Sequence, residues 1–217
     1  MPSPDTSLQW ILPPRQARTQ QTLERLLDAA ESLLQDKSFE DIPVSEIALR
    51  ADTSVAAFYR RFKDKNGLLH ALHERFCEAA IATANDALEP RRWEGASIRE
   101  ILDTVIPFLI DVLRRRETLQ RAVYRIAVSD ESMFERAFRL RRHIVKGLTE
   151  LLLDRRDEIL HPNPAAAVPF ALAQASALLT EVYMSGMSDP SQLPSSDSQI
   201  AEEIVESCCS YLFRNPL

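Results

Sequence analysis

The side chains best suited to binding chemistry are the hydrogen-bond donors and positive charges gathered between Arg50 and Lys65. This stretch has five basic and two acidic residues, whereas the whole chain of 217 residues has a net charge of −6. Guanidinium, ammonium and phenol groups donate hydrogen bonds to phosphate oxygens, and arginine can also bind the edge of guanine. A compact basic patch on an otherwise acidic chain indicates contact with a nucleic acid at one face. A face that is merely solvated is the simpler alternative.

The spacing of apolar residues around this patch predicts two short helices joined by a tight turn, followed by the start of a third. Residues 44–51 have apolar side chains at helical spacing, and residues 52–54 interrupt the pattern with turn-forming side chains. Ser54 can cap the next helix, whose inner face would carry Phe58 and Phe62. The outer face of that helix carries the basic residues, and the helix is short enough to enter the major groove of duplex DNA.

The pattern of these residues resembles the TetR family of bacterial transcriptional regulators. The family pattern runs Val-x-x-Ile-Ala, a turn containing Gly-Val-Ser, two small residues, an apolar residue and Tyr-x-x-Phe, with Lys and Leu soon after. The matching residues are Val44, Ile47, Ala48, Ser54, Ala56, Phe58, Tyr59, Phe62, Lys65 and Leu68. Because their spacing is unbroken, the resemblance is much more specific than a helix-turn-helix alone. It implies an N-terminal three-helix DNA-binding domain and a C-terminal helical domain for ligand binding and dimerisation.

Four positions depart from the family pattern. Asp52 replaces the turn glycine, Thr53 replaces Val, Ala57 replaces a frequent Thr, and Pro43 stands where a hydroxyl cap is common. Aspartate is one of the few residues besides glycine that adopt a positive φ at modest cost. These departures bear on the base contacts rather than on the fold. They leave open an alternative function, a protein-interaction and dimerisation module with a degenerate helix-turn-helix.

The expected DNA contacts follow from the resemblance and from side-chain chemistry. The resemblance implies that Tyr59 and Lys65 contact the phosphate backbone, and the hydroxyl of Ser54 can also meet a phosphate. Small side chains permit close approach and can touch a thymine methyl, whereas arginines can bind guanine or phosphate. The expected DNA-binding residues are Ser45, Ser54, Ala56, Ala57, Tyr59, Arg60, Arg61 and Lys65. Which of the two arginines faces the groove does not follow from the sequence.

Composition and periodicity place the chain in the all-α class. Apolar residues make up 45% and charged residues 27%, there are only four glycines, and no long strand-like alternation occurs. The expected parts are a flexible arm at 1–18, a helix-turn-helix domain at 19–66, a connecting helix at 67–89 and a helical regulatory and dimerisation domain at 90–217. Arg15 and Arg18 could reach phosphates or a minor groove, or be solvated.

Two C-terminal helices, expected at 165–184 and 198–213, have more apolar surface than one chain needs. In the TetR family the last two helices of each subunit form a four-helix bundle across a two-fold axis. The resemblance therefore implies a homodimer on an inverted-repeat (palindromic) operator, with recognition helices about 34–36 Å apart. The expected interface residues are Ala175, Leu178, Leu179, Val182, Ile204 and Cys208. The alternative is that these residues only cover the core of their own chain.

The resemblance also implies a pocket for a small-molecule effector of unknown identity among the helices of residues 98–184. The aromatic residues expected to line it are Phe108, Tyr124, Phe138 and Phe170. Aromatic residues at helical spacing are also typical of an ordinary core, so this alternative remains open.

Other function classes have less support. There is no Gly-rich phosphate loop, Ser-His-Asp arrangement or carboxylate pair in a recognisable motif, so we expect no enzymatic activity and no cofactor. His70, His73 and Cys77 lie on one helix face, but no fourth ligand follows, so a polar stripe is favoured over a metal site.

We expect a cytoplasmic protein without a membrane partner. An odd count of three cysteines fits a reducing compartment, and no charged-then-apolar signal pattern begins the chain. The apolar run at 162–180 is broken by prolines, which argues against a membrane span. The sequence thus predicts a DNA-binding transcriptional regulator, most simply a ligand-responsive repressor.

Overall fold

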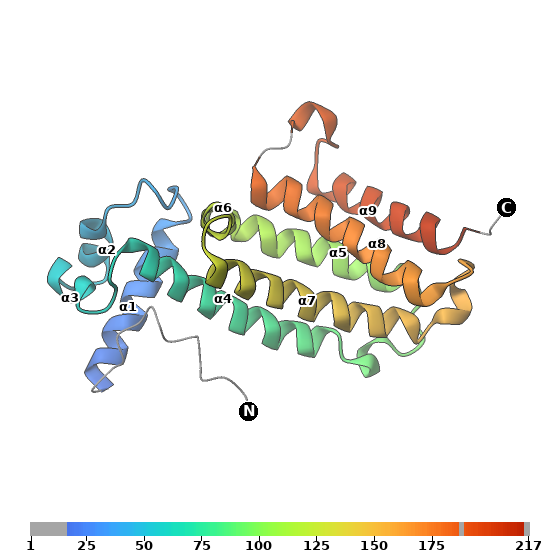
Figure 1. The fold of residues 1–217 in the computed structure, drawn as a ribbon, viewed down its shortest axis with the longest axis horizontal. Helices are drawn as coiled ribbons and strands as arrows, with labels where there is room; N and C mark the ends of the chain where they lie inside the picture. Colours follow the sequence, from blue (N-terminus) through green and yellow to red (C-terminus); the bar gives the residue numbers. More distant parts are fainter. Residues whose placement is uncertain (1–16, 187–188, 215–217) are drawn as a thin grey trace. The chain divides into compact units, whose positions relative to one another are not determined.

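The computed structural model describes residues 17–186 and 189–214, and Figure 1 shows their fold. Within these ranges the chain forms helices joined by turns and short loops, with no strand. The α-helices are α1 (Ala17–Leu33), α2 (Val44–Arg50), α3 (Val55–Tyr59), α4 (Lys65–Ala87), α5 (Ile98–Arg115), α6 (Glu117–Ala127), α7 (Glu131–Leu153), α8 (Pro164–Thr180) and α9 (Asp197–Leu212). The all-α prediction is confirmed. The expected arm at 1–18, with Arg15, lies almost entirely outside the described residues.

The chain divides into two compact units. Unit 1 contains the described residues up to Glu78 together with Ala122–Arg136, and unit 2 contains Ala79–Arg121 and the described residues from Ala137 onward. Residues 122–136, expected in the second domain, thus pack with the helix-turn-helix. The expected connecting helix at 67–89 is divided between the two units.

Unit 1 is built on a small apolar core under α1, α2 and α3. Leu26, Phe58, Phe62 and Leu68 are all fully buried, and the rings of Phe58 and Phe62 lie 5.1 Å apart between centroids. Burying side chains of this size contributes about 1.5–3 kcal/mol each. The core fixes α3 from its inner side, so the outer side of α3 is held in a defined position.

Unit 2 is a layered arrangement in which α9 packs against both α5 and α8 (Figure 1). Tyr183 is fully buried beside this core, and its hydroxyl donates a hydrogen bond to Asp197 at 2.9 Å. Burial and the neighbouring carboxylate raise the pKa of this phenol. Ser97 begins α5 with a reciprocal capping box to Glu100, as its sequence position favours.

The helical segment Pro164–Ser185 is, among the described residues, the one helix long and apolar enough to cross a membrane by length and composition. One third of its most apolar window is buried inside the protein. Its inner face packs against α9. Length and composition alone are weak grounds for a membrane span.

All three cysteines are buried as free thiols. Cys77 lies on α4, and Cys208 and Cys209 lie on α9 with exposed fractions of 4% and 3%. Burial raises the pKa of Cys208 to about 11 and also raises the pKa of Cys209. Thiolates are therefore scarce at these two positions near neutral pH.

Candidate nucleic-acid interface

The turn between α2 and α3 is fixed by backbone conformation and by one cap. Asp52 adopts the left-handed conformation with φ 48°, so aspartate occupies the position where the family has glycine without breaking the turn. Ser54 precedes α3 in extended conformation, and its hydroxyl accepts a hydrogen bond from the Ala57 amide at 3.1 Å. The next helix is capped in the same way, because Asp64 accepts from the Gly67 amide at 2.9 Å. These local contacts orient α3 relative to α2 and to the first turn of α4.

The outer face of α3 is formed by Val55, Ala56 and Tyr59. Val55 is 41% exposed and Tyr59 is 53% exposed, and Ala56 is also exposed. The inner face is formed by Ala57 and Phe58, which are 8% and 0% exposed. Ala57, expected to contact DNA, is therefore packed against the core.

Of the residues expected to make basic contacts, Arg61 is buried and Lys65 is half-buried. Arg61 is only 3% exposed, and burial lowers the pKa of its guanidinium. The ammonium of Lys65 donates to the backbone carbonyls of Phe39 and Glu40, and it lies 4.6 Å from the centre of the Phe39 ring. Burial lowers the pKa of Lys65, while Glu40 and Asp41 oppose this shift. Lys65 thereby fastens the start of α4 to the loop before α2.

The polar groups that remain exposed beside α3 are few. Arg60, at the C-terminal cap of α3, is exposed, and so are Lys63 and Ser45. Arg50 is also exposed and donates to the Ser32 hydroxyl at 2.6 Å. Between the two adjacent arginines, the structure thus places Arg60 outward and Arg61 inward.

Val55 is a surface residue of α3 that the sequence interpretation did not include. The signal for it was present, because Val55 and Tyr59 are four positions apart and share one helix face. Once Phe58 and Phe62 are assigned to the core, this face has to point outward. The short length of α3 made the orientation difficult to assign from periodicity alone.

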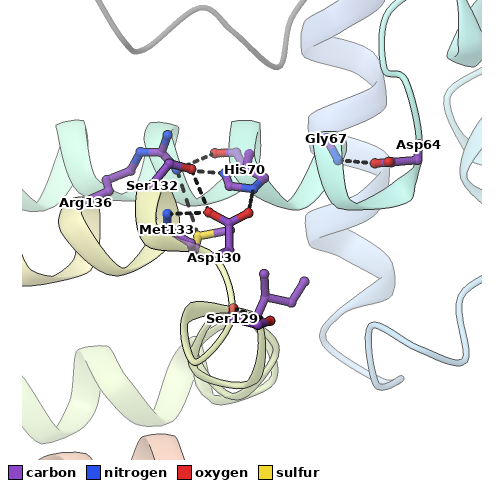
Figure 2. A network of polar contacts seen from close by, with 9 residues as sticks. Asp64, Gly67, His70, Ser129, Asp130, Ser132, Met133 and Arg136 are labelled. Carbon is purple, nitrogen blue, oxygen red and sulfur yellow. Dashed lines mark hydrogen bonds and ion pairs between the residues drawn. The ribbon is translucent and has the colours of Figure 1, made fainter.

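Within unit 1, α4 is linked to the junction between α6 and α7 by a polar network (Figure 2). The Nε2 atom of His70 lies 3.0 Å from Oδ2 of Asp130, and the other oxygen of Asp130 accepts from the Met133 amide at 2.9 Å. Asp130 therefore caps the start of α7 and holds His70 at once. The guanidinium of Arg136 pairs with Glu74 at 2.5 Å and lies 3.3 Å from Nδ1 of His70.

Burial lowers the pKa of two histidines on α4. The imidazole of His70 is 2% exposed, and burial is the main cause that lowers its pKa, with Asp130 opposing the shift. In one neutral tautomer of His70, Nε2 donates a hydrogen bond to Asp130 and Nδ1 accepts one from Arg136. Burial, followed by the charge of Arg136, lowers the pKa of His73 to about 3.

The residues His70, His73 and Cys77, which were weighed as metal ligands, make protein contacts. His70 is turned to Asp130, and Nε2 of His73 lies 3.4 Å from the Cys77 sulfur. Among the described residues, no group of three His, Cys, Asp or Glu side chains is placed to hold a metal ion.

Comparison with known proteins agrees with this geometry. Residues 26–72, which contain α2 and α3, match the family model described as "Bacterial regulatory proteins, tetR family". The chain therefore carries the DNA-binding domain of the TetR family of regulators. A curated relative, the uncharacterized HTH-type transcriptional regulator YvkB of Bacillus subtilis (strain 168), is 26% identical over 133 residues. That alignment covers 61% of this chain and 65% of YvkB.

Solved structures share the fold at low sequence identity. A transcriptional regulator from Cytophaga hutchinsonii ATCC 33406 has a TM-score of 0.65 at 14% identity, covering 88% of this chain and 96% of that protein. The regulator FadR from Bacillus subtilis, in complex with stearoyl-CoA, has a TM-score of 0.59 at 16% identity, covering 87% and 98%. Members of the TetR family are regulators and not enzymes, so the expected absence of catalysis agrees with the family.

Unit 2 contains a cavity of about 460 Å³ between α5 and α9. Its lining residues are Asp103, Pro107, Ile110, Asp111, Arg114, Asp197, Ser198, Ala201, Glu202 and Val205. None of the four aromatic residues expected at a pocket lines this cavity, so an effector site lined by them stays a prediction. Phe108 and Phe170 are 43% and 52% exposed, Phe138 lies beneath Arg141 and Arg142, and Tyr124 belongs to unit 1.

The positions expected at a TetR-type subunit interface are mostly internal. Ala175, Leu179, Ile204 and Cys208 are buried in the core of unit 2. Leu178 and Val182 are partly buried against the same core. The exposed side of α8 is formed by other residues, namely Ala166, Phe170, Ala173, Gln174 and Ala177.

Proposed function

We propose that this chain is a homodimeric, ligand-responsive repressor that binds an inverted-repeat operator in the cytoplasm. The observation that carries the proposal is the outward face of α3, held from beneath by the buried rings of Phe58 and Phe62. A recognition helix needs such support, because base contacts require side chains placed within a fraction of an ångström. The family match over residues 26–72 supports the same interpretation.

The proposed DNA-facing residues are Ser45, Ser54, Ala56, Tyr59 and Arg60, because all five are exposed. Arg60 and the phenol of Tyr59 would position the protein on phosphates beside the major groove. In this proposal Ala57, Arg61 and Lys65 act indirectly, by shaping and fixing the turn and the start of α4.

The exposed face of α8 is the proposed dimer surface. Phe170 is 52% exposed and packs beside Tyr211 at 5.5 Å between ring centroids, and small residues continue along the helix. Small side chains permit two helices to approach closely. A dimer would bind DNA far more tightly than a monomer, because its two recognition helices contact the same duplex. Sedimentation equilibrium of the purified protein tests the dimer.

The proposed effector site is in unit 2. The FadR structure contains stearoyl-CoA, which shows that a protein of this fold accommodates a small molecule. In this chain the opening between α5 and α9 is the candidate entry. An effector acts only if it binds the DNA-competent and DNA-incompetent states with different affinity.

The deciding experiment is binding of the full chain to its own upstream DNA across a salt series. Selective binding with a steep salt slope is expected, since each phosphate contact releases counterions. Tyr59→Ala should weaken binding similarly for every operator variant, because a phosphate contact positions the protein without reading sequence. Strong loss on only some variants would overturn that role for Tyr59.

The alternative function, an interaction module with a degenerate helix-turn-helix, predicts a different result. Neutralising the exposed cation in Arg60→Ala would then leave DNA affinity unchanged. The observed conformation of Asp52 removes one reason for this alternative, because the turn forms without glycine.

A further inference from the structure

The outward face of α3 lacks the side chains that read bases by paired hydrogen bonds. The helix has the sequence Val-Ala-Ala-Phe-Tyr, so it contains no Arg, Lys, Asn, Gln, Asp or Glu. Paired contacts to guanine, adenine or cytosine in the major groove depend on those side chains. The Ser54 hydroxyl, just before the helix, already accepts a hydrogen bond from the Ala57 amide.

What this face presents instead is apolar and small. Val55 is 41% exposed and Ala56 beside it is exposed, while the polar groups of the face lie toward its other end, at Tyr59 and Arg60. In helix-turn-helix complexes the N-terminal residues of the recognition helix contact base edges. Val55 and Ala56 are therefore the side chains placed to approach the bases.

We propose that α3 reads thymine methyl groups, with Val55 as the specificity-determining residue, and this rests on the DNA-binding function proposed above. The C5-methyl of thymine is the apolar group that the four base pairs present in the major groove. An amino group of adenine or cytosine placed against Val55 would lose water without gaining a partner, which disfavours those bases. Exposed cations at Arg60 and Lys63 complement the phosphates that flank such a site.

The size of the effect follows from the surface of one methyl group. Removing one buried methyl from water is worth about fourfold in affinity. Replacing the contacted thymine by deoxyuridine removes only that methyl and retains the base pairing. The expected loss is therefore about fourfold for each contacted thymine.

The test uses duplexes enriched from a random-sequence library by the full wild-type chain. Each thymine of the enriched site is replaced singly by deoxyuridine, and affinities are measured for the wild type and for Val55→Ala. At one or more thymines of each half-site the wild type should lose about fourfold, and Val55→Ala should lose much less there. Val55→Thr, which keeps the shape but replaces a methyl by a hydroxyl, should behave like Val55→Ala.

Val128→Ala is the matched control, since it shortens the same kind of side chain at a position that is 81% exposed. It should respond to deoxyuridine as the wild type does. If no deoxyuridine weakens binding, or if Val55→Ala loses as much as the wild type, methyl reading by Val55 is refuted while DNA binding stands. If no sequence is enriched, sequence-specific binding fails and this inference fails with it.

Discussion

Removing the carboxylate of Asp130 should loosen α4 in unit 1. Asp130→Ala deletes the cap of α7, which costs about 1 kcal/mol. It also removes the hydrogen bond between Asp130 and His70, whose imidazole is 2% exposed, and the loss of such a buried contact costs about 1–3 kcal/mol. The two effects together predict a loss of about 2–4 kcal/mol in the stability of this region.

Asp130→Asn separates the two contributions. Its amide oxygen can still cap α7, but its amino group would face the His70 donor, so only the histidine contact is lost. We therefore expect Asp130→Asn to lie between the wild type and Asp130→Ala. Glu135→Ala, an exposed carboxylate on the same helix, is the control and should be close to neutral.

Hydrogen exchange is the suitable assay, because it reports local stability rather than a global average. Amides in the peptide covering residues 65–78 should exchange faster in Asp130→Ala, and less so in Asp130→Asn. If exchange in this peptide is equal in the wild type and Asp130→Ala, the network shown in Figure 2 does not stabilise α4, and the reasoning is wrong.

Two further predictions concern unit 1. Asp52→Ala should destabilise the protein by about 1 kcal/mol, since alanine resists the left-handed conformation, whereas Asp52→Gly should be nearly neutral; equal urea midpoints for both variants would contradict this. Because burial lowers the pKa of His73 to about 3, the unfolded state binds a proton more readily, so this residue's contribution to stability falls as pH drops below about 6.5. Near pH 4.5 the loss should reach about 2–3 kcal/mol, and His73→Gln should reduce this acid sensitivity in urea titrations; an unchanged pH dependence would count against it.

Helical periodicity was sufficient for the fold. The sequence predicted a helix at 198–213, and the structure has α9 over Asp197–Leu212. The prediction that Asp52 could take the place of a turn glycine is also confirmed by its φ of 48°. These features depend on local propensity and on one apolar stripe per helix, both of which a single sequence contains.

The direction in which a side chain points was harder to predict for helices whose apolar stripe is short or missing. Arg60 and Arg61 follow a helix of only five residues, so periodicity could not separate the outward one from the buried one. Helix α8 is apolar almost all round, so no pattern indicates which side meets the core. Ala175 and Leu179, expected at the dimer interface, are buried in the core of their own chain. Predicting which aromatic residues line a pocket requires knowledge of how the helices pack against one another. The spacing of residues along the sequence does not contain that information.

The burial of every native thiol has a practical consequence for spectroscopy. Cys77, Cys208 and Cys209 are inaccessible, so alkylating spin labels should leave the wild-type chain almost unmodified. A cysteine introduced at the exposed position of Lys63 would then be labelled selectively, with no need for a cysteine-free background. In the proposed dimer, one pair of labels would report the distance between the two helix-turn-helix motifs directly, with and without an effector.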